Sequence, residues 1–272
     1  GSPTLTLRGT NNISGAGSIS FYNLAVGDAT ATSATTISNN ISVTGGALTT
    51  YTTSTIASSG TSTVTISGTG NIGGGSGSIA FYNLTINGTQ TLQSSITVSN
   101  NLSVSSSLAL NDKDVGVTNG DLATTGSGTI TCSGCSAGTA TLSGSGKNIG
   151  GGGTVTVYNL AINGAYTLQT STTANNDISI GDGNSLALND QDLTVGGGDL
   201  TTTGAGTVTC AGCTAGNCTV NGTAATGIGG GSGEITFHSL VIGGTIPIAS
   251  DITVLNDLTT NGTMNGSSNV TV

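Results

Sequence analysis

The chain has 272 residues, of which only 6% are charged, and its formal net charge is −9. Soluble domains carry about 25% charged residues, so this composition, with 47 glycines and many Ser, Thr and Asn residues, argues against a cytosolic enzyme. It also excludes nucleic-acid binding, because Arg8, Lys113 and Lys147 are the only basic residues and lie far apart, and a transmembrane helix, because no apolar run approaches the ~20 residues that span a bilayer.

Four near-copies of one phrase divide the chain. "GSISFYNL" begins at Gly17, "GSIAFYNL" at Gly77, "GTVTVYNL" at Gly153 and "GEITFHSL" at Gly233. The stretches between them consist of short segments in which apolar and polar residues alternate. These segments are rich in β-branched residues and show no helical pattern. Unequal spacing favours a solenoid over a propeller, because solenoid loops tolerate insertions. We therefore expect one all-β domain over residues 1–272, a β-solenoid built as a right-handed parallel β-helix of about twelve coils with open ends.

Within the phrase, the alternation of apolar residues changes parity. In "SIAFYNLTIN" one parity ends at Phe81 and the other begins at Leu84, which indicates a bend at Tyr82 and Asn83. Asn suits such a corner because it tolerates turn conformations and bonds the nearby backbone. The corner positions that we expect to stack along the axis are Asn23, Asn83 and Asn159, with Ser239 as the variant. The aromatic residues that we expect in the core beside them are Phe21, Phe81 and Phe237.

Both ends of the sequence read as strands without a cap. The first is "TLTL" and the last "NVTV", and joining them nearly continues the repeat. Uncapped strand edges associate unless charge, proline or a helix prevents it, so we expect head-to-tail stacking of copies into a filament. The alternative is a piece cut from a longer repeat protein. The residues expected in the end-stacking strands are Thr4, Leu5, Thr6, Leu7, Asn269, Val270, Thr271 and Val272.

Two CxxC motifs occupy matching positions in the repeats, "CSGC" at Cys132 and Cys135, and "CAGC" at Cys210 and Cys213. A shared zinc site is disfavoured, because the pairs would lie three or four coils apart and four ligands must converge on one metal. Thioredoxin-type redox chemistry lacks its βαβ context. We expect local disulfides formed in an oxidising compartment. The odd cysteine, Cys218, could be free, pair locally or cross-link subunits.

The motifs "NDKD" and "NDQD" place carboxylates on turns, which suits calcium. We favour plain solvated turns, because the chain has neither a full EF-hand loop nor a calcium-binding nonapeptide. No other cofactor is indicated. The calcium candidates are Asp112, Asp114, Asp190 and Asp192.

No catalytic arrangement is convincing, so we expect no enzyme activity. "GCSAG" over residues 134–138 fits the G-x-S-x-G nucleophile pattern, but its sister copy reads "GCTAG" and His238 is the only histidine. Thr-x-Thr segments could bind ice or a carbohydrate surface, although no uniform Thr column is evident in the repeats.

The stretches "FYNLTINGTQTLQSSITVSNNLSV" and "LALNDQDLTVGGGDLTTTGAGTVT" resemble repeats of large secreted β-helix proteins on prokaryotic surfaces, of the autotransporter or filamentous-haemagglutinin kind. The likeness covers nearly the whole chain and rests on a low-complexity pattern. It implies a parallel β-helix, secretion and a role in surface attachment or matrix. Those proteins are typically far longer than this chain.

These observations predict a non-enzymatic structural subunit of an extracellular filament, pilus-like or a matrix fibre, whose main partner is a second copy of itself. The alternative is a cell-surface adhesin passenger fragment that binds glycans or surfaces. The third hypothesis is an ice-binding protein.

Overall fold

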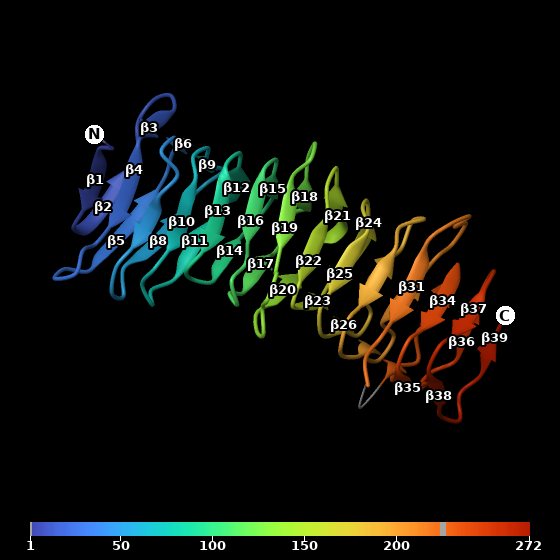
Figure 1. Ribbon diagram of the computed structural model, residues 1–272. Helices are drawn as coiled ribbons and strands as arrows, with labels where there is room; N and C mark the ends of the chain where they lie inside the picture. Colours follow the sequence, from blue (N-terminus) through green and yellow to red (C-terminus); the bar gives the residue numbers. More distant parts are fainter. Residues whose placement is uncertain (1, 224–226) are drawn as a thin grey trace. The chain divides into compact units, whose positions relative to one another are not determined.

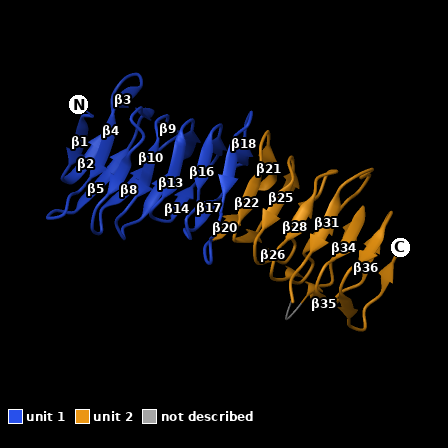
Figure 2. Cartoon of the chain, in the orientation of Figure 1, with its two compact units in different colours: residues 1–138 blue, residues 139–272 orange. Residues whose placement is uncertain are grey.

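The computed structural model describes residues 2–223 and 227–272, which form two compact units, residues 1–138 and 139–272 (Figures 1 and 2). Within the described residues the regular structure consists of 39 β-strands. None of the described segments is a helix long and apolar enough to cross a membrane.

Unit 1 consists of three parallel sheets that the chain visits in turn. Each strand pairs with the strand three places further along the chain, as β1 does with β4. The first sheet holds β1 (Thr4–Leu7), β4 (Asn23–Val26), β7 (Leu48–Thr50), β10 (Gly70–Gly73), β13 (Thr89–Leu92), β16 (Ser107–Ala109) and β19 (Thr129–Thr131). The second holds β2 (Gly9–Ile13), β5 (Ser33–Ile37), β8 (Thr55–Ser58), β11 (Ile79–Phe81), β14 (Ile96–Val98) and β17 (Val115–Val117). The third holds β3 (Ile19–Phe21), β6 (Ile41–Val43), β9 (Thr63–Ile66), β12 (Asn83–Ile86), β15 (Leu102–Val104) and β18 (Leu122–Thr124).

Unit 2 repeats this arrangement and splits two of its sheets toward the C-terminus. Its longest sheet holds β22 (Val155–Val157), β25 (Thr172–Ala174), β28 (Leu193–Val195), β31 (Asn217–Val220), β34 (Ser239–Ile242) and β37 (Leu258–Thr260). A second holds β20 (Thr139–Leu142), β23 (Asn159–Ile162), β26 (Ile178–Ile180), β29 (Leu200–Thr202) and β32 (Ile228–Gly229). A third holds β21 (Ser145–Gly151), β24 (Ala165–Leu168), β27 (Ser185–Ala187) and β30 (Thr207–Thr209). One short sheet holds β33 (Thr236–Phe237), β36 (Ile252–Val254) and β39 (Val270–Thr271). The other holds β35 (Thr245–Pro247) and β38 (Thr263–Asn265).

The predicted right-handed parallel β-helix is confirmed. One passage of the chain through three strands is called a coil here, so the 39 described strands make about 13 coils, close to the number expected. The sequence predicts one solenoid domain, and the structure describes two compact units of the same architecture.

The core consists of apolar residues stacked in columns from coil to coil. Leu84 pairs with Val64 on one side and Leu102 on the other, and all three side chains are fully buried. Burying a side chain of this kind stabilises the fold by about 1.5–3 kcal/mol. The neighbouring residues along each strand point outward and are mostly Ser and Thr. Of the aromatic residues expected in the core, Phe81 and Phe237 are fully buried, whereas Phe21 lies in the first coil and is half-buried.

The predicted stacking of the corner asparagines is wrong. Within unit 1, Asn23 begins β4 in the first sheet and Asn83 begins β12 in the third. Within unit 2, Asn159 begins β23 and Ser239 begins β34, again in different sheets. The phrase recurs after eight strands in the first case and eleven in the second, and neither number is a multiple of the three strands in a coil. Equivalent corners of successive repeats therefore lie at different corners of the solenoid.

Candidate functional site

The first coil, β1–β3, leaves part of the apolar core uncovered. Leu5 is in register with Leu24 of β4 and points the same way into the solenoid. Leu24 is 0% exposed and Leu5 is 44% exposed, because no described strand pairs with the other edge of β1. Leu7 stands in the same relation to Val26 and is half-buried, while Thr4 and Thr6 point outward and are exposed. The first coil thus presents an apolar surface and an unpaired strand edge.

The last coil, β37–β39, presents a matching surface. Leu258 is in register with the buried Leu240, and Val270 with the buried Ile252, but both terminal residues are only half-buried. Val272, directly after β39, is 67% exposed. Asn269 precedes β39, and like Thr271 it is exposed. The residues expected to lie in end-stacking strands therefore flank or form the outermost described strands at both ends.

The predicted cysteine pairs are both disulfide-bonded. Cys132 bonds Cys135 across a Cα–Cα distance of 5.3 Å, and Cys210 bonds Cys213 across 5.2 Å. Each disulfide closes the turn that follows a strand, β19 in unit 1 and β30 in unit 2. The first cysteine of each pair is buried and the second is partly exposed, so each disulfide fastens a surface turn to the core.

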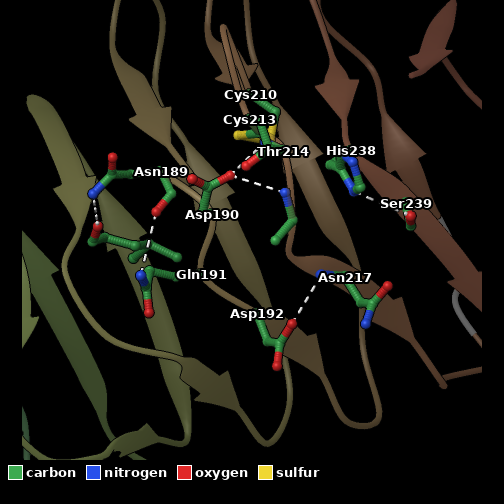
Figure 3. The surroundings of a disulfide bond; sticks show 12 residues. Asn189, Asp190, Gln191, Asp192, Cys210, Cys213, Thr214, Asn217, His238 and Ser239 are labelled. Atoms are coloured by element: carbon green, nitrogen blue, oxygen red, sulfur yellow. Dashed lines mark hydrogen bonds between the residues drawn. A yellow bond between two sulfur atoms is a disulfide. The ribbon is translucent and has the colours of Figure 1, made fainter. Parts of the chain in front are cut away.

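Asp190, a calcium candidate, lies on the turn of the preceding coil, beside the Cys210–Cys213 disulfide (Figure 3). Its Oδ1 accepts the backbone N–H groups of Thr214 at 2.6 Å and Ala215 at 3.0 Å. Asp190 has a φ of 60°, in the left-handed region that Asn and Asp tolerate better than most residues. The carboxylate therefore holds the cysteine turn of the next coil against its own.

Asp112 does the same in unit 1. Its Oδ1 accepts the N–H groups of Ser136 at 2.7 Å and Ala137 at 3.0 Å, directly after the Cys132–Cys135 disulfide. Ser136, the serine of the G-x-S-x-G match, therefore lies on an exposed turn that this carboxylate fixes.

The other two calcium candidates also bond their neighbouring coils. Asp192 Oδ1 accepts the N–H of Asn217 at 2.8 Å, and the Asp114 N–H donates to Ser95 Oγ at 2.9 Å. In the described part of the chain, no three His, Cys, Asp or Glu side chains gather as metal ligands would. Each of the four aspartates thus takes part in a hydrogen bond between coils.

Cys218 is a free, buried thiol in β31, in register with Leu193 and Leu240. Burial raises the pKa of this thiol, because the thiolate would lose its hydration. Its position in the core does not suit the cross-linking of subunits that the sequence left open. His238, which stands in place of the corner tyrosine, lies within hydrogen-bond distance of Ser239, Nδ1 to Oγ 3.3 Å.

A recurring pair of hydrogen bonds joins successive coils at the corners. Asn83 Oδ1 accepts the N–H of Asn101 at 3.2 Å, and the C=O of Asn101 accepts the N–H of Leu84 at 3.0 Å. We call this pair a corner clasp. The side-chain oxygen of an Asn or Asp accepts the backbone N–H of one residue in the next coil. The C=O of that same residue accepts the N–H of the residue that follows the Asn or Asp. Clasps with both bonds include Asn23–Ala47, Asn83–Asn101, Asn101–Asp121, Asn159–Asp177, Asp177–Asp199, Asp199–Gly227 and Asp251–Asn269.

The corner asparagines singled out from the sequence all begin clasps, but the clasp partners were missed. The signal was present as an Asn or Asp directly before the first inward-facing Leu or Ile, as in "NL" at Asn101 and "DI" at Asp177. Sequence pattern alone does not reveal the partner, because coil length varies and the bond joins residues 18–28 positions apart.

A Thr column lies on the outer face of the longest sheet of unit 2. In each of the six strands of this sheet, one outward-facing residue is in register with its counterpart in the neighbouring strand. Val241 interrupts the column, whose threonines are Thr156, Thr173, Thr194, Thr219 and Thr259. The column is not uniform, as the sequence predicts, but four consecutive strands carry a threonine at this position, a regularity that appears only once the strands are paired.

No protein-family model matches the chain, and no curated protein or solved structure shows significant similarity to it.

Proposed function

We propose that the chain is a non-enzymatic structural subunit of an extracellular filament, in which the coil β1–β3 of one copy stacks on the coil β37–β39 of the next. The observation that carries the proposal is the apolar core exposed at both terminal coils, most clearly at Leu5 and Val272. Exposed apolar surface beside an unpaired strand edge favours association with another strand.

The two surfaces are complementary in pattern. If β1 of one copy pairs with β37 of another as β4 pairs with β7 inside the chain, Leu5 lies against Leu258 in an apolar column. Each of these leucines has a buried partner on its inner side, and the contact gives it one on its outer side. The contact joins two different surfaces, so it does not close on itself and produces an open-ended chain of subunits.

The strands that would meet in this contact carry no charged side chains. Lys147 is the one charged residue inside a described strand, and the others lie at corners or in turns. Strand edges are commonly protected from association by charged side chains, and the strands of both terminal coils have none.

Three features support an extracellular location. The two disulfides are of a kind that persists in oxidising compartments and is rare in the cytosol. The repeats also resemble those of secreted prokaryotic β-helix surface proteins, and the low charge content suits a structural rather than a cytosolic role.

The test is negative-stain microscopy and sedimentation of the purified 272-residue chain at rising concentration. We expect unbranched threads above a threshold concentration. A Leu5→Lys variant is expected to raise that threshold strongly, whereas the control Tyr51→Lys is expected to leave it unchanged. The control is matched in exposure, because Tyr51 is 42% exposed, close to the 44% of Leu5, but it follows β7, two strands in from the unpaired edge of β1. Monomers that persist at high concentration would contradict the proposal.

A second candidate function is adhesion to a flat surface, either a glycan or ice, through the Thr column of unit 2. Its support is the register of those threonines on one outer face. Pull-down with insoluble polysaccharides and measurement of thermal hysteresis test it, with Thr194→Lys as the disabling variant. Unchanged surface binding by this variant would remove the Thr column from the account.

A further inference from the structure

The hydrogen bonds that Asn and Asp side chains accept from a neighbouring coil have a direction. Twelve Asn and Asp side chains in the described residues accept a backbone N–H from the next coil, and in each case the oxygen belongs to the earlier coil. These residues are Asn23, Asn40, Asn83, Asn101, Asp112, Asn159, Asp177, Asp182, Asp190, Asp192, Asp199 and Asp251. Through these bonds a coil offers its Asn and Asp oxygens toward the C-terminal side and receives them with backbone N–H groups on its N-terminal side.

Asp257, directly before β37, is arranged like an internal clasp residue. In the clasp of Asp177, the neighbouring Asn176 donates its Nδ2–H to Asp177 Oδ2 at 2.9 Å, and Oδ1 accepts the N–H of Asp199. At the last coil, Asn256 Nδ2 donates to Asp257 Oδ2 at 2.8 Å in the same way. The carboxylate is thus already oriented. The residue is exposed, and its Oδ1 bonds no other described residue.

The backbone also matches around this position. The N–H of Asn176 donates to Tyr158 O at 2.9 Å, and the N–H of Asn256 donates to His238 O at the same distance. In the internal clasp, the N–H of Ile178 donates to the C=O of Asp199 in the next coil. Leu258 is the counterpart of Ile178, so its N–H points toward the position that a following coil would occupy.

Thr4 is the residue of the first coil that fits this position. It directly precedes Leu5, the first inward-facing residue, as Asp199 directly precedes Leu200. The N–H of Asn23 donates to Pro3 O at 3.2 Å, and successive residues of a parallel strand bond to opposite neighbours. The N–H of Thr4 therefore points away from β4, toward the unpaired edge of β1.

We propose that Asp257 is the specificity-determining residue of the head-to-tail contact, and that it closes a corner clasp on Thr4 of a second copy. Asp257 Oδ1 accepts the N–H of Thr4, and the C=O of Thr4 accepts the N–H of Leu258. The inference rests on the proposed filament function and adds a fixed register and polarity to it. Two equal ends cannot meet, because one carries the acceptor and the other the donor.

The test compares three variants of the full chain by sedimentation and by the rate of thread growth. Asp257→Ala removes the acceptor and is expected to weaken association about tenfold or more, as the loss of a hydrogen bond to a charged group does. Asp257→Asn retains Oδ1, as in the clasp of Asn83, and is expected to restore most of the association. Thr4→Pro removes only the donor, at a strand start where proline is tolerated, and is expected to match Asp257→Ala.

Asp177→Ala serves as the control for a purely structural effect. It breaks an internal clasp, so it is expected to lower the melting temperature without weakening association below that temperature. Asp257→Ala is expected to leave the monomer's melting temperature unchanged. If the wild-type chain assembles and Asp257→Ala assembles equally well, the clasp is refuted and the filament proposal stands. If the wild-type chain stays monomeric, both are refuted.

Discussion

The Oδ1 atom of Asp177 accepts the backbone N–H of Asp199 at 2.9 Å, one coil further along unit 2. The backbone N–H of Asp177 donates to Asn159 Oδ1, and Asp199 Oδ1 accepts the N–H of Gly227. Consecutive clasps therefore form a ladder along one corner. A side-chain oxygen at each step satisfies a backbone N–H that would otherwise have no partner at the corner.

Replacement of Asp177 by Ala is expected to lower the free energy of unfolding by about 1–3 kcal/mol, because it leaves the N–H of Asp199 without its acceptor. Replacement by Asn is expected to cost much less, since Asn83 and Asn101 serve in equivalent clasps. Urea denaturation followed by circular dichroism measures both. Equal losses in the two variants would show that the charge, and not the clasp, stabilises this corner.

A second prediction concerns a polar residue in the core. Gln90 is 0% exposed; its Nε2 donates to Gly68 O at 2.5 Å, and its Oε1 has no protein partner. A buried acceptor without a partner costs about 1–3 kcal/mol. Gln90→Leu is therefore expected to leave stability unchanged or to raise it by about 1 kcal/mol, despite the lost bond. Thermal unfolding measures this, and a marked loss of stability would indicate that Oε1 is satisfied by buried water.

Tyr166→Phe is the contrasting change. The hydroxyl of this buried tyrosine accepts the N–H of Gly144 at 2.9 Å. Removing it strands a buried backbone donor, which is expected to destabilise unit 2 by about 1–3 kcal/mol. The same thermal measurement applies. A neutral result would mean that the Gly144 N–H finds another acceptor.

The disulfides give a third prediction. A loop as short as Cys210–Cys213 restricts the unfolded chain little, so the double replacement by Ser is expected to cost about 2 kcal/mol by the loop-entropy relation. Melting with and without a reductant measures the effect on the wild-type chain. A much larger loss would mean that the disulfide, rather than Asp190, holds the turn in place.

Close packing of coils gives a fourth prediction. A Cβ at Gly88 would lie 2.0 Å from Gly68 O of the preceding coil, so Gly88→Ala is expected to force the two coils apart and destabilise unit 1 strongly. Gly116, inside β17, is the matched control. The nearest atom to its Cβ would be 3.7 Å away, so Gly116→Ala is expected to be neutral or mildly stabilising. Similar melting temperatures for the two variants would contradict the close approach.

Much of the fold was predictable because alternation and repetition are local. The parity change after Phe81 located a true corner, since β11 ends at Phe81 and β12 begins at Asn83. What failed depends on pairing between distant residues. Coils differ in length, so the sequence did not reveal which corners coincide, that Asp177 bonds Asp199, or that Thr156 and Thr173 begin a column.

The ends illustrate the same limit. The strands "TLTL" and "NVTV" were recognisable from alternation. The role inferred for Asp257 was not, because it depends on the match between its bond to Asn256 and that of Asp177 to Asn176. A pattern of residues identifies an edge, and only the hydrogen bonds around it define what that edge can accept.

Head-to-tail stacking is tested most directly by cysteine cross-linking between two single variants. With Leu5 against Leu258, the outward-facing Thr6 and Thr259 become neighbours across the contact. We predict that the Thr6→Cys and Thr259→Cys variants, mixed under oxidising conditions, form a disulfide-linked dimer that contains one copy of each. Each variant alone is expected to run as a monomer on a denaturing gel. Dimers of a single variant, or no mixed dimer at concentrations where threads form, would contradict the account.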